Sequence, residues 1–383
     1  MVIKLDKIQL PTSTFACGPA QALPAQRQLF LYQTQFERSH RAPDISYNGL
    51  YKETETHLRR LLHIPSDYML LFFPGGATAA MDAVVWSLAK DSVSGLNMGA
   101  FSRLWCQIAA RIPNIKTNFQ QADLIPHTLP NMSASLVLLT PNETSTGVQL
   151  PDDFLLQAWG LRHSDTLVAW DTTSCAGGRV LPSAAYDIQL FALQKCFAAG
   201  GGTCVIVLSP KAIERIKKVT ASRCVPYFLD LSQAVSFARR SQTLNTPSTI
   251  TIFLANEACK FMLSHGGLNA MENLCKQHAD FLVRWANQTD WCRPLVHDEK
   301  FRSFTTLTLE IIHSQVTDTA INQALTQTGL ANLQDGLKKY RTVEKNSLRI
   351  ACFPFVDPNG TEQYKKITAA LDEIVRQLRK QQN

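Results

Sequence analysis

Short apolar runs alternate with amphipathic helical patterns between residues 67 and 265. The apolar runs are rich in β-branched and aromatic residues and predict strands at 68–73, 135–140, 166–171, 188–194 and 204–209. Helical spacing covers 76–90, 152–163 and 210–219, and the last of these begins with Ser209-Pro210, a typical helix start. Strands that alternate with helices predict an α/β fold with a mostly parallel sheet flanked by helices.

The C-terminal third has a different pattern. Two long helical patterns, at 248–264 and 269–287, are separated by Gly266-Gly267, which predicts a helix stop and a domain hinge. A strand, a helix, a second strand and a long amphipathic helix are then expected at 304–311, 318–328, 348–353 and 362–380. We therefore expect a large domain at 1–265, with an N-terminal segment that contributes to the substrate site, and a small α+β domain at 266–383.

Composition supports two globular domains and excludes several functional classes. The chain has 383 residues, 45% of them hydrophobic and 18% charged. Its ten cysteines show no metal-ligand spacing and no disulfide framework, so we expect no metal, reduced thiols and a cytoplasmic location. The N-terminus lacks the apolar core of a signal peptide, and no apolar run reaches membrane-spanning length. The net charge of +7 is dispersed, so we expect neither a nucleic-acid nor a membrane partner.

Two of the apolar runs end in residues that can carry chemistry. Asp171 ends the run 166–171, and Lys195 follows the run 188–194 and precedes Gly200-Gly201-Gly202. A lysine amine and a carboxylate at neighbouring strand ends are typical of a pyridoxal phosphate (PLP) site. The lysine binds the cofactor covalently and moves a proton at the substrate Cα, while the carboxylate keeps the pyridine nitrogen protonated. Each feature has a simpler alternative, because Lys195 also fits a solvated surface lysine and Asp171 a helix cap.

Other segments supply further parts of such a site. The loop 73–79 joins a strand to a helix with small residues, which suits a phosphate, although a tight turn alone also explains it. It is not a P-loop, because the Gly-Lys-Ser/Thr ending is absent. Phe101 offers a ring for stacking, or is a core aromatic, and Thr144 offers a donor for the ring oxygen. The turn 245–247 also suits a phosphate.

Cationic residues far apart in sequence indicate an anionic substrate. His40 and Arg41 lie near the start of the chain and Arg349 near its end. Arginine binds carboxylate or phosphate through two parallel hydrogen bonds, so such groups suit a substrate with two anionic ends. A surface position is the alternative for each of them.

Taken together, these motifs resemble the phosphoserine aminotransferase family, a class-V group of fold-type I PLP enzymes. The resemblance covers nearly the whole chain, and its landmarks occur in the family's order: 15–20, 39–41, 75–79, 142–147, 171–174, 194–195, 245–247 and 348–351. The chain is most similar to the branch with Gly-Gly-Ala-Thr-Ala in the glycine loop.

The resemblance implies a homodimer and assigns a role to each matching residue. Lys195 is then the Schiff-base lysine, Asp171 the pyridine partner, Phe101 the stacking residue and Thr144 the neighbour of the ring oxygen. Ala77, Thr78, Thr173 and Gln194 contact the cofactor phosphate or its surroundings, and Asn245 and Thr246 reach the partner subunit's cofactor phosphate. His40, Arg41, Arg349 and Arg341 hold the anionic ends of the substrate.

The implied activity is a ping-pong transfer of the amino group from L-glutamate to 3-phosphohydroxypyruvate, giving O-phospho-L-serine and 2-oxoglutarate in serine biosynthesis. The longer phosphohydroxythreonine pair is an alternative substrate. Two other hypotheses are a cysteine desulfurase-like lyase, with Cys352 or Cys292 as its catalytic cysteine, and a non-catalytic homologue. The chain departs from the family pattern at Thr78, where another branch has arginine, at Tyr340, where histidine is common, and at Cys196, where asparagine is usual.

Overall fold

The computed structural model describes residues 3–5, 8–13, 15–17, 41–42, 49–328, 337–341 and 343–380. Among the described helices, none combines the length and apolar character needed to cross a membrane.

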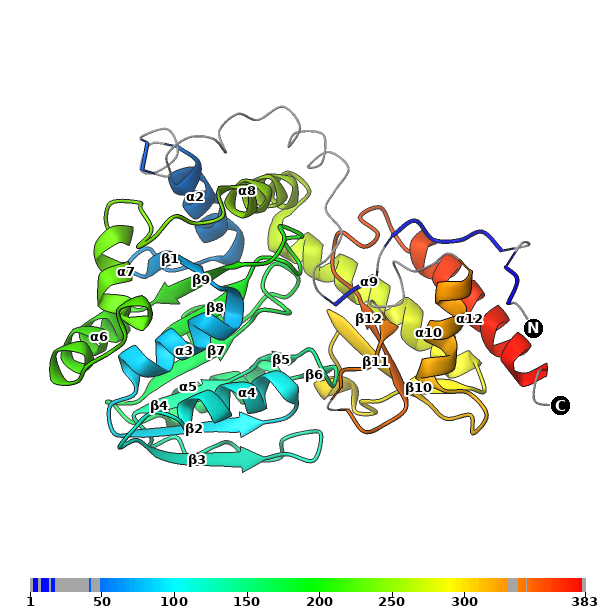
Figure 1. Ribbon diagram of the computed structural model, residues 1–383, viewed down its shortest axis with the longest axis horizontal. Helices are drawn as coiled ribbons and strands as arrows, with labels where there is room; N and C mark the ends of the chain where they lie inside the picture. The colour runs from blue at the N-terminus through cyan, green and yellow to red at the C-terminus, as the bar shows by residue number, and fades with distance from the viewer. Residues whose placement is uncertain are drawn as a thin grey trace.

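A seven-stranded sheet forms the larger part of the molecule, in the order β1-β9-β8-β7-β4-β2-β3 (Figure 1). The strands are β1 (Met69–Pro74), β2 (Ser92–Asn97), β3 (Lys116–Gln121), β4 (Leu136–Leu139), β7 (Leu167–Asp171), β8 (Ile188–Ala192) and β9 (Thr203–Leu208). All neighbouring pairs are parallel except those of β9, which is antiparallel to both β8 and β1. The connection 193–202 is too short for a parallel crossover, so β9 turns back beside β8. The predicted mostly parallel sheet is confirmed.

Helices cover both faces of this sheet, which explains why its strands are continuous apolar runs. Alternate residues of one strand enter opposite cores: Leu167 and Ala169 of β7 lie in one core, and Val168 and Trp170 in the other. The first core also contains α3 (Gly76–Leu88), α4 (Ala100–Ala109), α6 (Pro210–Ser222) and α7 (Leu231–Ala238). The second contains α2 (Leu50–Leu62), α5 (Asp152–Leu161) and α8 (Thr249–Ser264).

A smaller α+β unit follows. Its antiparallel sheet has the order β10-β11-β12, from β10 (Cys292–Pro294), β11 (Thr306–Ile311) and β12 (Ser347–Ala351). It packs with α10 (Asp318–Gln327), α12 (Glu362–Lys380) and the end of α9 (Gly267–Gln288) around a separate core. Leu268 and Met271, at the start of α9, belong instead to a core of the large sheet. The division at residues 265 and 266 stays a prediction, and α9 is the element that joins the two cores.

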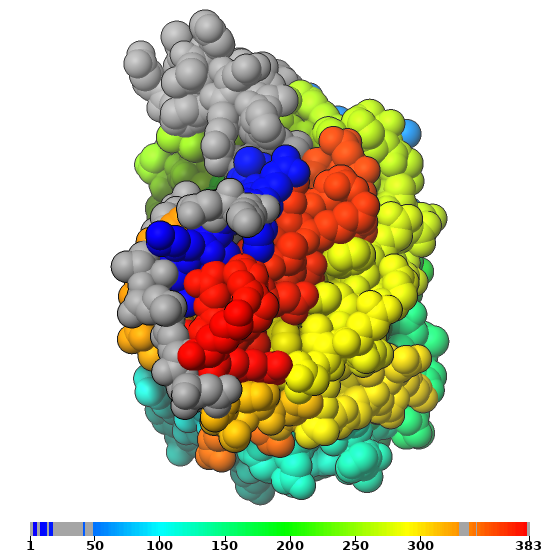
Figure 2. Space-filling view, turned by 90° about the vertical axis from the view of Figure 1, so that its right-hand side faces the viewer, coloured from blue at the N-terminus to red at the C-terminus, as the bar shows by residue number. Residues whose placement is uncertain are grey.

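The N-terminal segment lies against the C-terminal helix (Figure 2). The Gln363 side chain accepts from the Thr12 backbone amide at 2.9 Å, and the Phe15 ring packs on Tyr364 at 5.2 Å. The Ala351 amide donates to the Phe15 carbonyl at 3.1 Å. These contacts bring Cys17 beside the end of β12.

The remaining elements are the ribbon of β5 (Asn142–Glu143) and β6 (Val148–Gln149) and the short helices η2 (Tyr227–Leu229) and η3 (Glu299–Phe301).

Candidate active site

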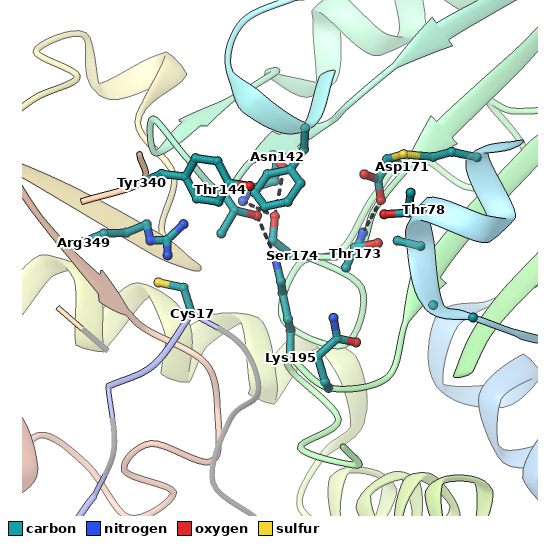
Figure 3. A pocket seen from close by; sticks show the side chains of 16 residues that line it. Cys17, Thr78, Asn142, Thr144, Asp171, Thr173, Ser174, Lys195, Tyr340 and Arg349 are labelled. Carbon is teal, nitrogen blue, oxygen red and sulfur yellow. Dashed lines mark hydrogen bonds between the residues drawn. The ribbon is translucent and has the colours of Figure 1, made fainter. Parts of the chain in front are cut away.

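The carboxyl ends of the sheet strands open onto a cavity of about 340 Å³ (Figure 3). Because β1, β4, β7 and β8 run in the same direction, the residues that follow them meet at one edge of the sheet. The N-terminal segment and the small unit close the other side. The lining residues are Cys17, Gly75, Gly76, Ala77, Thr78, Met81, Phe101, Asn142, Thr144, Asp171, Thr173, Ser174, Gln194, Lys195, Tyr340 and Arg349.

Lys195 lies in the turn between β8 and β9. Gly200 and Gly202 adopt positive φ angles of 80° and 90° there, which allows the chain to reverse sharply after the lysine. The side chain is only 6% exposed, and its Nζ donates to Thr144 Oγ1 at 2.7 Å. Burial lowers the pKa of Lys195, and the Arg349 guanidinium lowers it further. A lysine with a lowered pKa is a better nucleophile and base near neutral pH.

Asp171 ends β7 and faces the same cavity. It is 4% exposed, and its Oδ1 accepts from the Thr173 backbone amide at 3.0 Å. Burial raises the pKa of Asp171, and the hydrogen bonds from Thr173 oppose that rise. A cation placed beside this carboxylate would offset the cost of burying its charge. Figure 3 shows Asp171 and Thr78 on one side of Lys195, and Arg349 and Cys17 on the other.

The start of α3 forms a cradle for an anion. Gly75 and Gly76 have φ angles of 90° and 70°, and among the described residues no side chain caps the first backbone amides of the helix. A Cβ on Gly75 would lie 2.6 Å from the Ala79 Cβ, so the tight approach of loop and helix requires glycine. Free amides at a helix N-terminus bind phosphate well.

Arg349, Tyr340 and Cys17 form the wall opposite Asp171. The Arg349 guanidinium lies 5.5 Å from the Tyr340 ring centroid, and Tyr340 contacts the Phe101 ring at 5.0 Å. Within the part of the chain that the structure describes, no carboxylate pairs with Arg349, and its Nε has no hydrogen-bond partner. Burial raises the pKa of Cys17, while Arg349 and Lys195 act against that rise. An arginine without a protein anion in a cavity is suited to bind an anionic ligand.

The structure brings most of the predicted site residues into this one cavity: Ala77, Thr78, Phe101, Thr144, Asp171, Thr173, Gln194, Lys195 and Arg349. The others lie elsewhere. Asn245 and Thr246 are exposed before α8, the Arg41 guanidinium lies 5.1 Å from the Phe237 ring, and Arg341 is exposed beside Tyr340. His40 lies outside the described residues. All these roles stay predictions.

Several lining residues were not predicted as site residues. Asn142 and Ser174 follow the ends of β4 and β7, and Asn142 Nδ2 donates to Ser174 Oγ at 2.7 Å. Their position as polar residues after buried strands is a signal that sequence analysis can use. Cys17, Met81 and Tyr340 carry no such signal, because Cys17 and Tyr340 arrive from distant segments and Met81 lies within an apolar helix face.

The donor set fits the cofactor expected from the sequence. Free helix amides can hold the phosphate of PLP, Phe101 lies beside the space for its ring, and the buried Asp171 carboxylate suits a protonated ring nitrogen. Gln194 lines the cavity, and its Oε1 is buried without a hydrogen-bond partner among the described residues, so its amide group is available to a ligand.

Comparisons with known proteins agree with this geometry. The family model described as aminotransferase class-V matches residues 16–350. The chain is 32% identical to the phosphoserine aminotransferase of Corynebacterium glutamicum (strain R), over 94% of each chain. It is 30% identical to that of Rhodococcus opacus (strain B4), over 95% of each chain. The fold matches the crystal structure of a phosphoserine aminotransferase from Cytophaga hutchinsonii with a TM-score of 0.83 and 24% identity, over 95% of this chain and 99% of that one.

Proposed function

The chain belongs to the class-V aminotransferase family of PLP-dependent enzymes, and we propose that within this family it is a phosphoserine transaminase. It would move the amino group between L-glutamate and 3-phosphohydroxypyruvate, giving O-phospho-L-serine and 2-oxoglutarate in a ping-pong sequence. The names of its relatives support this choice, and so does the chemistry of the cavity. The reaction would belong to serine biosynthesis.

The observation that carries the transaminase part of the proposal is the Arg349 guanidinium in the same cavity as Lys195. Both amino acids and both keto acids of the reaction carry a carboxylate next to the reacting carbon. A guanidinium without a protein carboxylate partner among the described residues can bind that group through two parallel hydrogen bonds. The reacting carbon would then lie close to the lysine amine.

The residues that would hold the cofactor follow from the cavity. The amides at the start of α3, with Ala77 and Thr78, would hold the phosphate, and Asp171 would hold the ring nitrogen. Phe101 would cover the ring, and Thr144 would lie near its oxygen. Bound PLP supplies an electron sink for the negative charge that develops when the Cα proton leaves.

Lys195 would move that proton. Burial lowers the pKa of Lys195, which favours the neutral amine that would remove the Cα proton and deliver it to the cofactor carbon on the other side of the transferred nitrogen. Thr144 holds the amine at 2.7 Å and so limits the directions in which it points. The buried position of the lysine excludes water that would compete for the proton.

Arg349 would bind one anionic end of the substrate, so the second end requires residues from outside the wall that Arg349, Tyr340 and Cys17 form. Arg41, Arg341 and His40 are the proposed ligands for the substrate phosphate. Asn245 and Thr246 would contact the partner subunit's cofactor phosphate in a homodimer, which is consistent with their exposure in the single chain. A cytoplasmic location is part of the same proposal.

The alternative of a cysteine desulfurase-like lyase receives no support from the cysteines. Such an enzyme needs a catalytic cysteine on a mobile loop, but Cys352 and Cys292 are both buried, the latter on β10. Cys224 is the exposed cysteine of the chain, and it does not line the cavity.

The test is product analysis of the purified enzyme with PLP, L-glutamate and one of three acceptors. We expect O-phospho-L-serine from 3-phosphohydroxypyruvate at a much higher kcat/KM than alanine from pyruvate. The four-carbon keto acid related to phosphohydroxythreonine is the third acceptor. A higher kcat/KM with that acceptor or with pyruvate would contradict the assignment to phosphoserine.

A further inference from the structure

Glu143 is a fully buried carboxylate that has no part in the chemistry described above. It lies in β5, directly before Thr144, and is 0% exposed. Its Oε2 accepts from the Ser102 amide at 2.8 Å and from Ser102 Oγ at 2.9 Å. Its Oε1 accepts from Ser145 Oγ at 2.7 Å, from the Ser145 amide at 3.1 Å and from the Phe101 amide at 3.4 Å. Burying a carboxylate is costly unless donors surround it, as they do here.

These hydrogen bonds join two elements that both reach the cavity. Phe101 and Ser102 lie in the first turn of α4, where the backbone amides have no partner within the helix and favour a negative charge. Ser145 follows Thr144 in the next loop, and its Oγ also accepts from the Ala100 amide at 2.9 Å. The carboxylate therefore ties the helix start that carries Phe101 to the loop that carries Thr144.

The fit around Glu143 is close. A Cβ on Gly99 would lie 2.5 Å from Ser145 Oγ and 2.6 Å from Glu143 Cγ. Both distances are below any ordinary contact, so the approach of Gly99 to Glu143 requires a residue without a side chain. A substitution at Gly99 would displace the carboxylate without changing its charge.

We infer that Glu143 is a positioning residue of the active site: it fixes the Phe101 ring and the Thr144 hydroxyl relative to each other, and thereby orients Lys195 and the bound cofactor. Thr144 accepts from Lys195 Nζ, and that nitrogen lies 5.2 Å from the Phe101 ring centroid. A shift of either element would change both contacts of the lysine. The inference rests on the proposed placement of PLP between these residues.

The negative charge of Glu143 has a second effect that geometry alone does not produce. Glu143 and Asp171 both raise the pKa of Lys195, against burial and Arg349. Removal of the Glu143 charge should therefore lower the pKa of the Lys195 nitrogen. Displacement of an intact carboxylate should leave that electrostatic effect largely in place.

The experiment compares Glu143→Gln and Gly99→Ala with the wild type. In Glu143→Gln the amide group is the same size, but whichever way it turns, its N–H faces a backbone N–H. A matched control is Glu299→Gln on η3, where the side chain is 87% exposed. The measurements are the PLP dissociation constant, the pH titration of the bound cofactor's absorption, kcat for glutamate, and apoprotein melting.

We expect kcat to fall by about 100-fold in both Glu143→Gln and Gly99→Ala, as for a misplacement of about 1 Å. PLP should bind more weakly in both, and the absorption midpoint should move further to lower pH in Glu143→Gln, which loses the charge, than in Gly99→Ala. Glu299→Gln should match the wild type. Wild-type PLP affinity, titration and kcat in both variants would overturn the inference, even with lower melting temperatures. A wild type without any cofactor absorption would overturn the proposed site as well.

Discussion

Replacement of Arg349 by methionine tests the proposed binding of the substrate carboxylate. Arg349→Met keeps an unbranched side chain but removes the guanidinium from the cavity wall. No carboxylate among the described residues competes for this group, so its hydrogen bonds are available to the substrate. Two charge-assisted hydrogen bonds at roughly 1.5 kcal/mol each give about 3 kcal/mol, which is roughly 150-fold in kcat/KM for glutamate.

The same substitution should also change the pH dependence. Arg349 lowers the pKa of Lys195, so its removal raises that pKa and moves the acid limb of the kcat/KM profile to higher pH. PLP affinity should change little, because Asp171 and the start of α3 lie on the other side of Lys195 (Figure 3).

The assay is a stopped-flow measurement of the cofactor absorption after mixing with glutamate, at a series of pH values. The control is Arg376→Met on α12, where the side chain is 53% exposed and paired with Glu373. If Arg349→Met gives the same kcat/KM and pH profile as Arg376→Met, Arg349 does not bind the substrate carboxylate and the reasoning is refuted.

Four further substitutions test the cofactor side. Lys195→Ala should abolish transamination while circular dichroism shows an intact fold; retained turnover would exclude Lys195 as the catalytic lysine. Lys195→Met should stabilise the apoprotein in urea unfolding, because burial disfavours the charged amine. The stabilisation should grow as the pH falls from 10.5 towards the lowered pKa of the folded state. A stabilisation that shrinks as the pH falls would contradict this. Asp171→Asn should weaken PLP binding roughly tenfold or more, which corresponds to the loss of one charge-assisted hydrogen bond. An equilibrium titration measures this affinity, and an unchanged affinity would argue against contact of Asp171 with the ring nitrogen. Thr144→Val should lower the pKa of Lys195 in the apoenzyme, because the Thr144 hydroxyl lies 2.7 Å from the lysine Nζ and stabilises the charged amine. A pH profile of lysine-specific labelling that does not shift would contradict this.

The sequence predicts the elements that carry the cofactor side because their signals are local. The apolar runs before Asp171 and Lys195 correspond to β7 and β8, and the helix expected at 76–90 is α3. The strands β2 and β3 and the helices α2 and α4 were not predicted. β2 contains serine and glycine, and β3 is polar and largely exposed at the sheet edge, so neither shows the apolar run of a central strand.

The substrate side depends on contacts that no local pattern encodes. Tyr340 contacts Phe101 through tertiary packing of two segments that lie far apart in the sequence, and Cys17 arrives through the pairing of Phe15 with Ala351. The antiparallel direction of β9 was also missed, since it depends on the short connection through Lys195 rather than on the apolar run itself. Glu143 looked like an ordinary loop residue, because its donors come from a helix about forty residues earlier.

The most direct test of the account is an absorption spectrum of the purified, PLP-loaded protein during successive additions of substrate. The account predicts that the visible cofactor band is lost when glutamate is added and returns when 3-phosphohydroxypyruvate follows. A band that glutamate leaves unchanged, or one that 3-phosphohydroxypyruvate fails to restore, would contradict the proposed phosphoserine transaminase activity.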